Sequence, residues 1–575
     1  MGNDEIADVL EEIADMLELR DDNFYHQRAY RLAAESVRSY PEPIALLPRD
    51  QLQKIHGIGS NLAARLATLL DTGDLPLLTE LRQKYPRSLL DLKSIPGLGT
   101  NRIKILAELF NIRSREDLKH AVETGSLAKL RGFGPKLQER LRTSLAADTV
   151  GSKEALRRVP YGEAAQIAAQ LLSHLHHDAE IEQAEVAGSF RRKTDTIGDL
   201  NLIAASAEPD SVTRRFLSFP GIVHTLGSGP TEASATVTGG LRVELHIVPV
   251  EHWGAALVWF TGSKSHLSAL QSIAKTRGLR LDVSGLFCGG ESLAAKSEEE
   301  VYRALAMHWI PPELRESRGE IEAAERPFSA LLELTDLRGD LHSHSTWTDG
   351  RASIEQMARS AEKHGLEYFA LTDHSQRLKM VHGLDPARLR EQWLEIDSVR
   401  ARVPGVKLLR GIEVDILEDG ALDLTQDVLA QLDWVVASVH SKLDQEPAAM
   451  TARLLRAIRN PMVDEIGHPT GRLIGRRNPS NYDLDAVLRA ASEEGCAMEV
   501  NSQVDRLDLR DESCLAAKRA GVKLVISSDA HSPTGFALLS NGVNQARRGW
   551  IEARDVLNTR PLANLRQRRP LRGIP

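Results

Sequence analysis

Residues 339–350 read GDLHSHSTWTDG, and this stretch decides the fold predicted for residues 336–575. His342 and His344 stand two positions apart, which predicts that both point to one face of a strand. Further along, short apolar runs each end at a polar signature: TDHS at 372–375, GIEVDI at 411–416, SVHS at 438–441, GHPT at 467–470 and SDAH at 528–531. Helical stretches separate these runs. The pattern predicts a parallel β/α barrel with its chemistry at the strand ends.

A nitrogen and oxygen ligand set gathers at these strand ends. The six signatures supply six histidines and three carboxylates: His342, His344, Asp349, His374, Glu413, His440, His468, Asp529 and His531. Such ligands suit Zn²⁺, Mn²⁺ or Fe²⁺. A lone histidine is more often a core or surface residue, but nine ligands in six signatures predict a metal centre.

Other polar residues lie close to the predicted ligands. Arg472, Arg476 and Arg477 are candidates for holding substrate phosphates, and the alternative is a solvated basic loop. Asp373 and Asp415 stand beside ligands, where they either orient them or are ordinary residues at a strand end.

A second candidate site lies in AGSFRRKTDTIGDLNLI, residues 187–203. A turn at Gly188 and Ser189, followed by Arg191 and Arg192, is suited to holding a triphosphate. The strand that follows carries two polar residues on one face, and a later strand, LRVELHI, brings a third. These three residues are Asp199, Asn201 and Glu244.

The first 150 residues repeat one short motif three times. IHGIGS at 55–60, IPGLGT at 95–100 and RGFGPK at 131–136 each predict a glycine hairpin between two helices. Such hairpins leave backbone N–H groups free for phosphate oxygens, and Ser60 and Thr100 are predicted helix N-caps. One hairpin alone is a simple helical turn, but three beside basic residues predict contact with a nucleic-acid backbone. The predicted contact residues are Gly57, Gly59, Ser60, Gly97, Gly99, Thr100, Gly132, Gly134 and Lys136.

Length and composition limit the class of protein. The 575 residues predict about four domains or subdomains. Three cysteines form no disulfide framework, and no stretch supplies the about 20 apolar residues that cross a bilayer. We therefore expect a cytoplasmic protein. The net charge of −8 argues against a nucleic-acid partner. However, residues 1–50 hold 12 acids and 5 bases, whereas residues 81–150 hold 14 bases and 7 acids. The net charge therefore hides a basic segment that favours a nucleic-acid partner.

The C-terminal signatures resemble the PHP (polymerase and histidinol phosphatase) domain, and every ligand position is filled. The resemblance implies three metal ions, Mn²⁺ or Zn²⁺. The first would be held by His342, His344, Glu413 and Asp529, the second by Glu413, His440 and His468, and the third by Asp349, His374 and His531. Metal-bound water would then attack a phosphoester.

Residues 187–203 resemble the nucleotidyltransferase palm of family X DNA polymerases, which uses Mg²⁺ or Mn²⁺. WFTGSKSH at 259–266 resembles the family's element at the sugar of the incoming nucleotide, which implies that role for Trp259, Phe260 and Gly262. In the family pattern, aspartates stand at the positions of Asn201 and Glu244. We therefore expect weaker metal binding and slow synthesis that favours Mn²⁺. Asn61 and Arg65 stand where lyase lysines are found in animal relatives, so no Schiff-base lyase is expected.

The whole chain resembles bacterial family X DNA polymerases that carry a PHP domain. The expected domains are a helix-hairpin-helix region at 1–150 (an 8-kDa-like domain and fingers), an α/β palm at 151–250, a thumb at 251–315, a linker at 316–335 and the PHP domain at 336–575. The resemblance implies a monomeric, nucleoid-associated repair enzyme that fills gaps with dNTPs and removes 3′ ends of DNA. Two alternatives stay open: a PHP nuclease whose palm only binds DNA, and a small-molecule phosphatase fused to a binding module.

Overall fold

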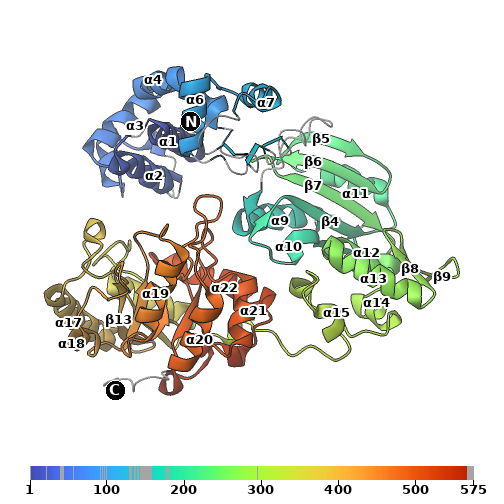
Figure 1. Ribbon diagram of the computed structural model, residues 1–575. Coiled ribbons are helices and arrows are strands. Elements are labelled where there is room, and N and C mark those ends of the chain that lie inside the picture. Colours follow the sequence, from blue (N-terminus) through green and yellow to red (C-terminus); the bar gives the residue numbers. More distant parts are fainter. Residues whose placement is uncertain are drawn as a thin grey trace. The chain divides into compact units, whose positions relative to one another are not determined.

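The computed structural model divides into two compact units, Met1–Ala155 and Leu156–Pro575 (Figure 1). It describes residues 2–20, 22–38, 40, 44–55, 57–90, 92, 95, 98, 100–127, 133–134, 137–138, 141–142, 158–176, 181–293 and 295–565. Among these residues, no helix combines the length and apolar character needed to cross a bilayer.

The first unit is helical in its described part. Its α-helices are α1 (Asn3–Leu19), α2 (Phe24–Arg38), α3 (Ser60–Thr72), α4 (Pro76–Lys84), α5 (Arg87–Leu90), α6 (Thr100–Phe110) and α7 (Arg115–Glu123), with short 3₁₀ turns η1 (Ile44–Leu46) and η2 (Arg49–Lys54). Leucine, isoleucine and alanine recur at helical spacing in these segments, and their side chains form one buried core.

Arginines of neighbouring helices neutralise much of the acidic charge of α1. Arg38 contacts Asp8 and Glu11 at 2.6 and 2.8 Å, and Arg82 forms a two-pronged bond with Glu12 at 2.8 and 2.7 Å. These pairs hold α1 against α2 and α4. The acid excess of the first 50 residues therefore serves packing within this unit.

The first glycine hairpin starts α3 in a way that differs from the sequence prediction. Gly57 has a φ of +75°, and a Cβ there would lie 2.6 Å from Cγ of Leu32, so the turn requires glycine. Gly59 takes the N-cap position with extended backbone and has no side chain with which to cap the helix, which makes Ser60 the first helical residue. The prediction of Ser60 as N-cap was therefore wrong.

The second unit begins with an α/β region built on a five-stranded sheet of order β2-β4-β7-β6-β5. Its strands are β2 (Gln183–Val186), β4 (Asp199–Ala205), β5 (Ile222–Ser228), β6 (Glu232–Val237) and β7 (Arg242–Val248), and β1 (Val159–Pro160) pairs with β3 (Thr196–Ile197) outside it. Alternate residues of β4 face opposite sides. One side packs against α9 (Tyr161–His176) and α11 (Pro209–Leu217), the other against α12 (Trp253–Thr261).

A second layer of helices and a small three-stranded sheet follow α12 in the chain. They comprise α13 (Lys264–Thr276), α14 (Glu298–Ala304), α15 (Glu320–Ala323) and the strands β8 (Leu279–Asp282), β9 (Gly285–Cys288) and β10 (Glu291–Leu293). At the centre, the fully buried Arg315 contacts both carboxylate oxygens of Glu298 at 2.6 and 3.0 Å. Burial raises the pKa of Glu298, but the charges of Arg315 and Arg191 outweigh it and lower the pKa to about 2.

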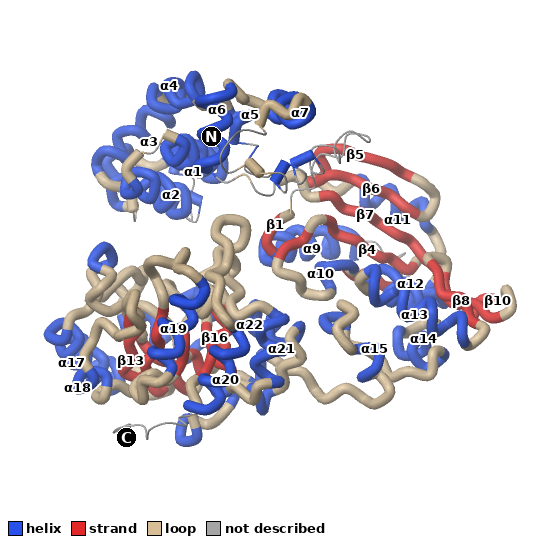
Figure 2. The backbone as a smooth tube through the Cα atoms, in the orientation of Figure 1, coloured by secondary structure: helices blue, strands red, loops and turns tan. Residues whose placement is uncertain are grey.

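The C-terminal part is a barrel of parallel strands ringed by helices (Figure 2). The strands run in sequence order: β11 (Gly339–Asp340), β12 (Tyr368–Leu371), β13 (Lys407–Asp415), β14 (Trp434–Ser438), β15 (Glu465–Ile466), β16 (Ala497–Asn501) and β17 (Leu524–Ser527). A parallel bridge between Ser343 and Ala530 joins the two edges. The surrounding helices are α16 (Ile354–Lys363), α17 (Pro386–Arg402), α18 (Gln426–Leu429), α19 (Pro447–Ile458), α20 (Leu484–Glu494), α21 (Asp511–Arg519) and α22 (Leu539–Arg548).

The alternation of side chains along the strands separates two cores. Phe369 and Val435 point outward to the helices, whereas Tyr368, Trp434 and Val436 point into the barrel. Leu557 and Leu565 from the C-terminal segment join this inner cluster. Apolar side chains therefore fill part of the interior and leave the carboxyl ends of the strands for polar groups.

The segment expected to be a linker is packed on both sides. Glu320 is fully buried and lies 2.7 Å from His266 of α13, and Arg318 donates to Asp511 of α21 at 2.9 Å. Arg548 of α22 donates to the backbone oxygen of Arg192 at 2.6 Å and to Glu316 at 3.0 Å. Charged residues of the predicted linker therefore join the α/β region to the barrel.

Candidate metal centre and nucleotide site

The residues predicted as metal ligands converge at the carboxyl ends of the barrel strands. Glu413 lies in β13, and the others follow β11, β12, β14, β15 and β17 directly or within the next loop. His342 and His344 follow the two-residue strand β11, so the prediction that a strand carries them was wrong. They still face one carboxylate, because their Nε2 atoms lie 3.7 and 3.1 Å from Oδ1 of Asp529.

Three clusters of potential ligands form within this group. His344, Asp349, His374 and His531 make one, His342, His344 and Asp529 a second, and His374, Glu413 and His440 a third. His468 joins the last through its Nε2, 2.9 Å from Oε1 of Glu413. The clusters differ from the grouping predicted from the resemblance in two ways. His344 and His374 each take part in two clusters, and Glu413, predicted to bridge two ions, belongs to one.

Several buried imidazole nitrogens lack a hydrogen-bond partner among the described residues. They are Nε2 of His342, both nitrogens of His344, Nδ1 of His374, Nε2 of His440 and Nδ1 of His468. Nδ1 of His374 lies 2.8 Å from Oε2 of Glu413 without the geometry of a hydrogen bond. An unpaired buried polar atom is costly, so a ring of them around carboxylates fits divalent cations as the missing partners.

Electrostatics keeps the carboxylates of the centre ionised. Burial raises the pKa of Glu413, but the charges of His374, His440 and His342 outweigh it and hold the pKa well below its usual range. Burial likewise raises the pKa of Asp529, and neighbouring histidines outweigh it. Ionised oxygen ligands are the form that binds a cation.

Residues behind the ligands orient them. Asp415, in β13, lies 2.9 Å from Nδ1 of His440 and so fixes that ring. Among the described residues, Asp373 forms no hydrogen bond or ion pair with a histidine, and its hydrogen-bond partners include Ser345, Thr348 and Gln392. It accepts from the backbone and hydroxyl of Ser345 at 2.9 and 2.6 Å and so shapes the loop between His344 and Asp349.

The three arginines predicted to hold substrate phosphates lie in different environments. Arg472 is buried, 2.9 Å from Asp195 of the α/β region. Arg477 donates to the backbone of Gly471 at 2.7 Å, and Arg476 is exposed. Arg506 was not predicted, although its Nε lies 3.9 Å from Oδ2 of Asp529, because no spacing rule singles out an arginine in the loop after β16.

The second candidate site lies on the face of the five-stranded sheet that also packs against α12. Asn201 in β4 stands opposite Glu244 in the adjacent β7, and Nδ2 of Asn201 lies 3.3 Å from Oδ2 of Asp199. Arg242, two residues before Glu244, contacts its carboxylate at 2.7 Å. The structure therefore brings the three predicted residues together, with an arginine beside them.

The residues predicted to form a phosphate-holding turn instead begin the short helix α10 (Gly188–Arg191), with Ala187 as its N-cap, next to this face. Gly188 has a φ of +64°, and a Cβ there would lie 3.1 Å from the Asn201 amide. The buried hydroxyl of Ser189 has no hydrogen-bond partner among the described residues. Arg191 is bound to Glu298 at 2.7 Å and Arg192 to Glu316 at 3.0 Å.

The predicted sugar-contact element ends α12. Phe260 stacks on His246 of β7 with ring centroids 4.0 Å apart, and Trp259 packs against the helical layer that follows. Gly262 is the C-cap of α12, where a Cβ would lie 3.0 Å from the His266 ring.

The predicted DNA contacts lie in the first unit, and only part of them can be located. Gly59 and Gly134 have open space where a Cβ would stand. The hydroxyl of Thr100 donates to Glu18 at 2.8 Å, so it is engaged within the unit. Gly97, Gly99, Gly132 and Lys136 lie outside the described residues.

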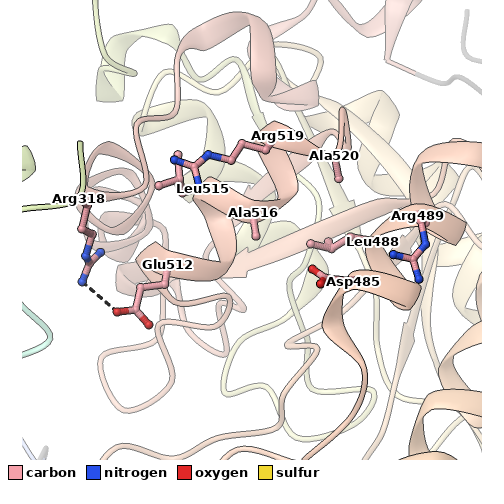
Figure 3. A pocket seen from close by; sticks show the side chains of 9 residues that line it. All are labelled: Arg318, Asp485, Leu488, Arg489, Glu512, Leu515, Ala516, Arg519 and Ala520. Carbon is pink, nitrogen blue, oxygen red and sulfur yellow. Dashed lines mark ion pairs between the residues drawn. The ribbon is translucent and has the colours of Figure 1, made fainter. Parts of the chain in front are cut away.

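A groove on the outside of the barrel is lined by none of the residues of either site (Figure 3). It measures about 690 Å³ and runs between α20 and α21, with Leu488, Leu515 and Ala516 among its lining residues. None of the predicted ligands lines it, so this groove is not the predicted metal site.

Comparison with known proteins identifies the domains. Two helix-hairpin-helix domain families match residues 1–75 and 89–147, the DNA polymerase beta thumb family matches 256–316, and the PHP domain family matches 340–503. Probable phosphatases of Thermoanaerobacter sp. (strain X514) and Vibrio campbellii are 32% and 31% identical over 234 and 209 residues, which cover 38% and 34% of this chain and 89% and 78% of theirs. The DNA polymerase/3′-5′ exonuclease PolX of Bacillus subtilis (strain 168) is 37% identical over 569 residues, 98% of this chain and 99% of that protein. The chain therefore belongs to the PolX family of bacterial family X DNA polymerases with a C-terminal PHP domain.

Proposed function

We propose that this chain is a DNA repair enzyme that fills gaps with its α/β region and removes nucleotides from 3′ ends with its barrel. The observation that carries the proposal is the group of buried histidine nitrogens that lie close to Glu413, Asp529 and Asp349 without hydrogen-bond geometry. A chain similar over almost its whole length to a polymerase/exonuclease is expected to use such a centre on DNA.

The chain's own residues perform three tasks in the barrel. Histidines and carboxylates at the strand ends would hold up to three ions, Mn²⁺ or Zn²⁺, with the grouping predicted from the resemblance. When bound, such ions lower the pKa of water and stabilise the charge on a phosphate undergoing attack. Arg506, beside Asp529, would meet the substrate phosphate, and Asp415 would keep the His440 ring oriented.

The α/β region would use Asp199, Asn201 and Glu244 for nucleotidyl transfer with Mg²⁺ or Mn²⁺. An amide at position 201 supplies no charge, and Arg242 competes for Glu244. We therefore expect synthesis to be slow and to favour Mn²⁺. Arg191 and Arg192 would meet the dNTP phosphates only after leaving Glu298 and Glu316.

The partner proposed for the first unit is the backbone of gapped or 3′-ended DNA. The glycine hairpins carry this proposal, since Gly59 leaves the start of α3 uncovered. Contact with phosphates would fix the position of the DNA without reading its sequence.

One set of assays tests these activities. The purified chain is offered gapped DNA with dNTPs, and a recessed 3′ end without dNTPs, each with Mg²⁺ or Mn²⁺. We expect extension in the first and 3′ shortening in the second, both stronger with Mn²⁺. Absence of extension under all conditions would refute synthesis and leave the α/β region a role in holding DNA. Histidinol phosphate is included, and its preferential hydrolysis would favour a small-molecule phosphatase.

A further inference from the structure

A buried glutamate that is not among the predicted ligands lies behind two of them. Glu499 is a residue of β16 and points into the barrel with no exposed surface. Its Oε1 lies 2.8 Å from Nδ1 of His342, a hydrogen bond across 157 residues of sequence. The other ring nitrogen, Nε2, faces Glu413 and Asp529 at 3.4 and 3.7 Å. The bond to Glu499 therefore leaves Nε2 as the nitrogen that faces the centre.

The second oxygen of the same carboxylate holds another ligand. Oε2 accepts from the backbone N–H of His468 at 2.5 Å. His468 has a φ of +27°, a value that side-chain-bearing residues rarely adopt, so this N–H is bonded at a strained point of the backbone. Nδ2 of Asn501 lies 3.3 Å from Oε2 and 3.0 Å from Oδ2 of Asp529, which joins a third ligand to the same group.

We propose that Glu499 is a positioning residue of the metal centre, which sets the ring of His342 and the backbone of His468 so that both can bind a cation. The inference rests on the proposed metal centre. Glu499 acts through these two residues, since a carboxylate bonded to Nδ1 fixes the tautomer whose Nε2 carries a free lone pair.

The chemistry of the two bonds requires a carboxylate of this length. Both partners donate a proton, so both side-chain atoms must be acceptors. Glutamine offers one oxygen and one NH₂ group, so it can accept from only one partner and turns a donor toward the other. Aspartate keeps both acceptors but is shorter by one methylene, so it cannot reach both partners from the same backbone position.

A neighbouring glutamate provides a matched control. Glu465, in the adjacent strand β15, is equally buried and accepts from Nε1 of Trp434 at 3.1 Å. It has no hydrogen bond to a predicted ligand among the described residues. Glu465→Gln therefore makes the same substitution beside the same ring, since Glu465 groups with Glu499 around His342. It leaves the hydrogen bonds of Glu499 to His342 and His468 in place.

The test measures Mn²⁺ binding to the full-length chain by competition with a chromophoric chelator, together with the melting temperature of the metal-free protein. We expect Glu499→Gln to weaken Mn²⁺ binding by about 10- to 100-fold with unchanged stoichiometry at saturation, and Glu465→Gln to change it by less than about threefold. Glu499→Asp should give an intermediate loss and serves as the second variant should Glu499→Gln fail to fold.

Two results would overturn the inference alone. The first is equal affinity in Glu499→Gln and Glu465→Gln, which would make Glu499 structural. The second is loss of one whole ion at saturation with the other sites unchanged, which would make Glu499 a ligand. A native chain that binds no Mn²⁺ or Zn²⁺ would instead refute the metal centre itself, and the inference with it.

Discussion

The amide of Asn201 offers the most informative perturbation of the nucleotide site. Nδ2 of Asn201 lies 3.3 Å from Oδ2 of Asp199. In Asn201→Asp an oxygen takes that position, and two carboxylates then face each other at the same distance. Coulomb's law gives a repulsion of about 1 kcal/mol at the dielectric constant of water and about 5 kcal/mol at an effective value near 20.

A divalent cation between the carboxylates removes this repulsion, so the variant should bind Mg²⁺ more tightly than the native chain. If only about 1.4 kcal/mol of the repulsion is recovered as binding, the affinity rises about tenfold. We therefore expect gap filling by Asn201→Asp to become at least about tenfold faster with Mg²⁺, and the preference for Mn²⁺ to shrink. Without metal, the same repulsion should lower the melting temperature.

The assay is single-nucleotide gap filling over a range of Mg²⁺ concentrations. His344→Ala is present in every protein compared, so that 3′ degradation does not hide synthesis. Asn201→Ala is the matched control, because it removes the amide without adding a charge. The reasoning fails if Asn201→Asp and Asn201→Ala respond to Mg²⁺ alike, since the added carboxylate would then not reach the metal.

Three further predictions concern the barrel, the helical layer and the first hairpin. His344→Ala should abolish 3′ shortening in the recessed-end assay, because His344 belongs to two ligand clusters. Substitution of an exposed histidine, His364→Ala, is the control and should leave the shortening unchanged. Shortening that persists in His344→Ala would place the nuclease elsewhere. Glu298 has a folded-state pKa of about 2 against 4.5 unperturbed, so it contributes about 3 kcal/mol of stability above pH 4.5 that is lost as the pH falls toward 2. Glu298→Gln should melt lower at pH 7 and lose stability less steeply below pH 4.5, and an unchanged melting curve would refute the buried ion pair. Gly57→Ala should destabilise the first unit by about 1–3 kcal/mol in urea unfolding, and Gly59→Ala by much less, because only the former meets Leu32 and a positive φ; equal losses would contradict this turn geometry.

The sequence predicted the barrel strands and the residues that gather at their ends, because both depend on local patterns. The run WVVASVH, for example, becomes β14 followed by His440. Residues that matter through distant partners were missed. Glu499 reads as one polar residue within an apolar strand, and only the closed barrel brings it to His342.

The contacts of the predicted linker and of Arg472 were not predicted for the same reason, namely that they depend on distant partners. Sequence spacing could not reveal that Glu320 is buried against His266 or that Arg472 pairs with Asp195, because each partner lies more than 50 residues away. Ser60 was expected to cap α3, but the extended backbone of Gly59 already occupies that position. Side-chain preference predicted a cap near the right place and missed it by one residue.

The contacts between the α/β region and the barrel bear on how this sequence can change over time. Asp511 accepts from Arg318 at 2.9 Å and from Arg548 at 2.7 Å, and Arg548 also binds Glu316. Losing any one of these charges removes a counter-charge from a largely buried network and destabilises the contact between the two regions. Substitutions at positions 316, 318, 511 and 548 are therefore expected to be correlated among relatives, so that the polymerase and the exonuclease evolve as a pair.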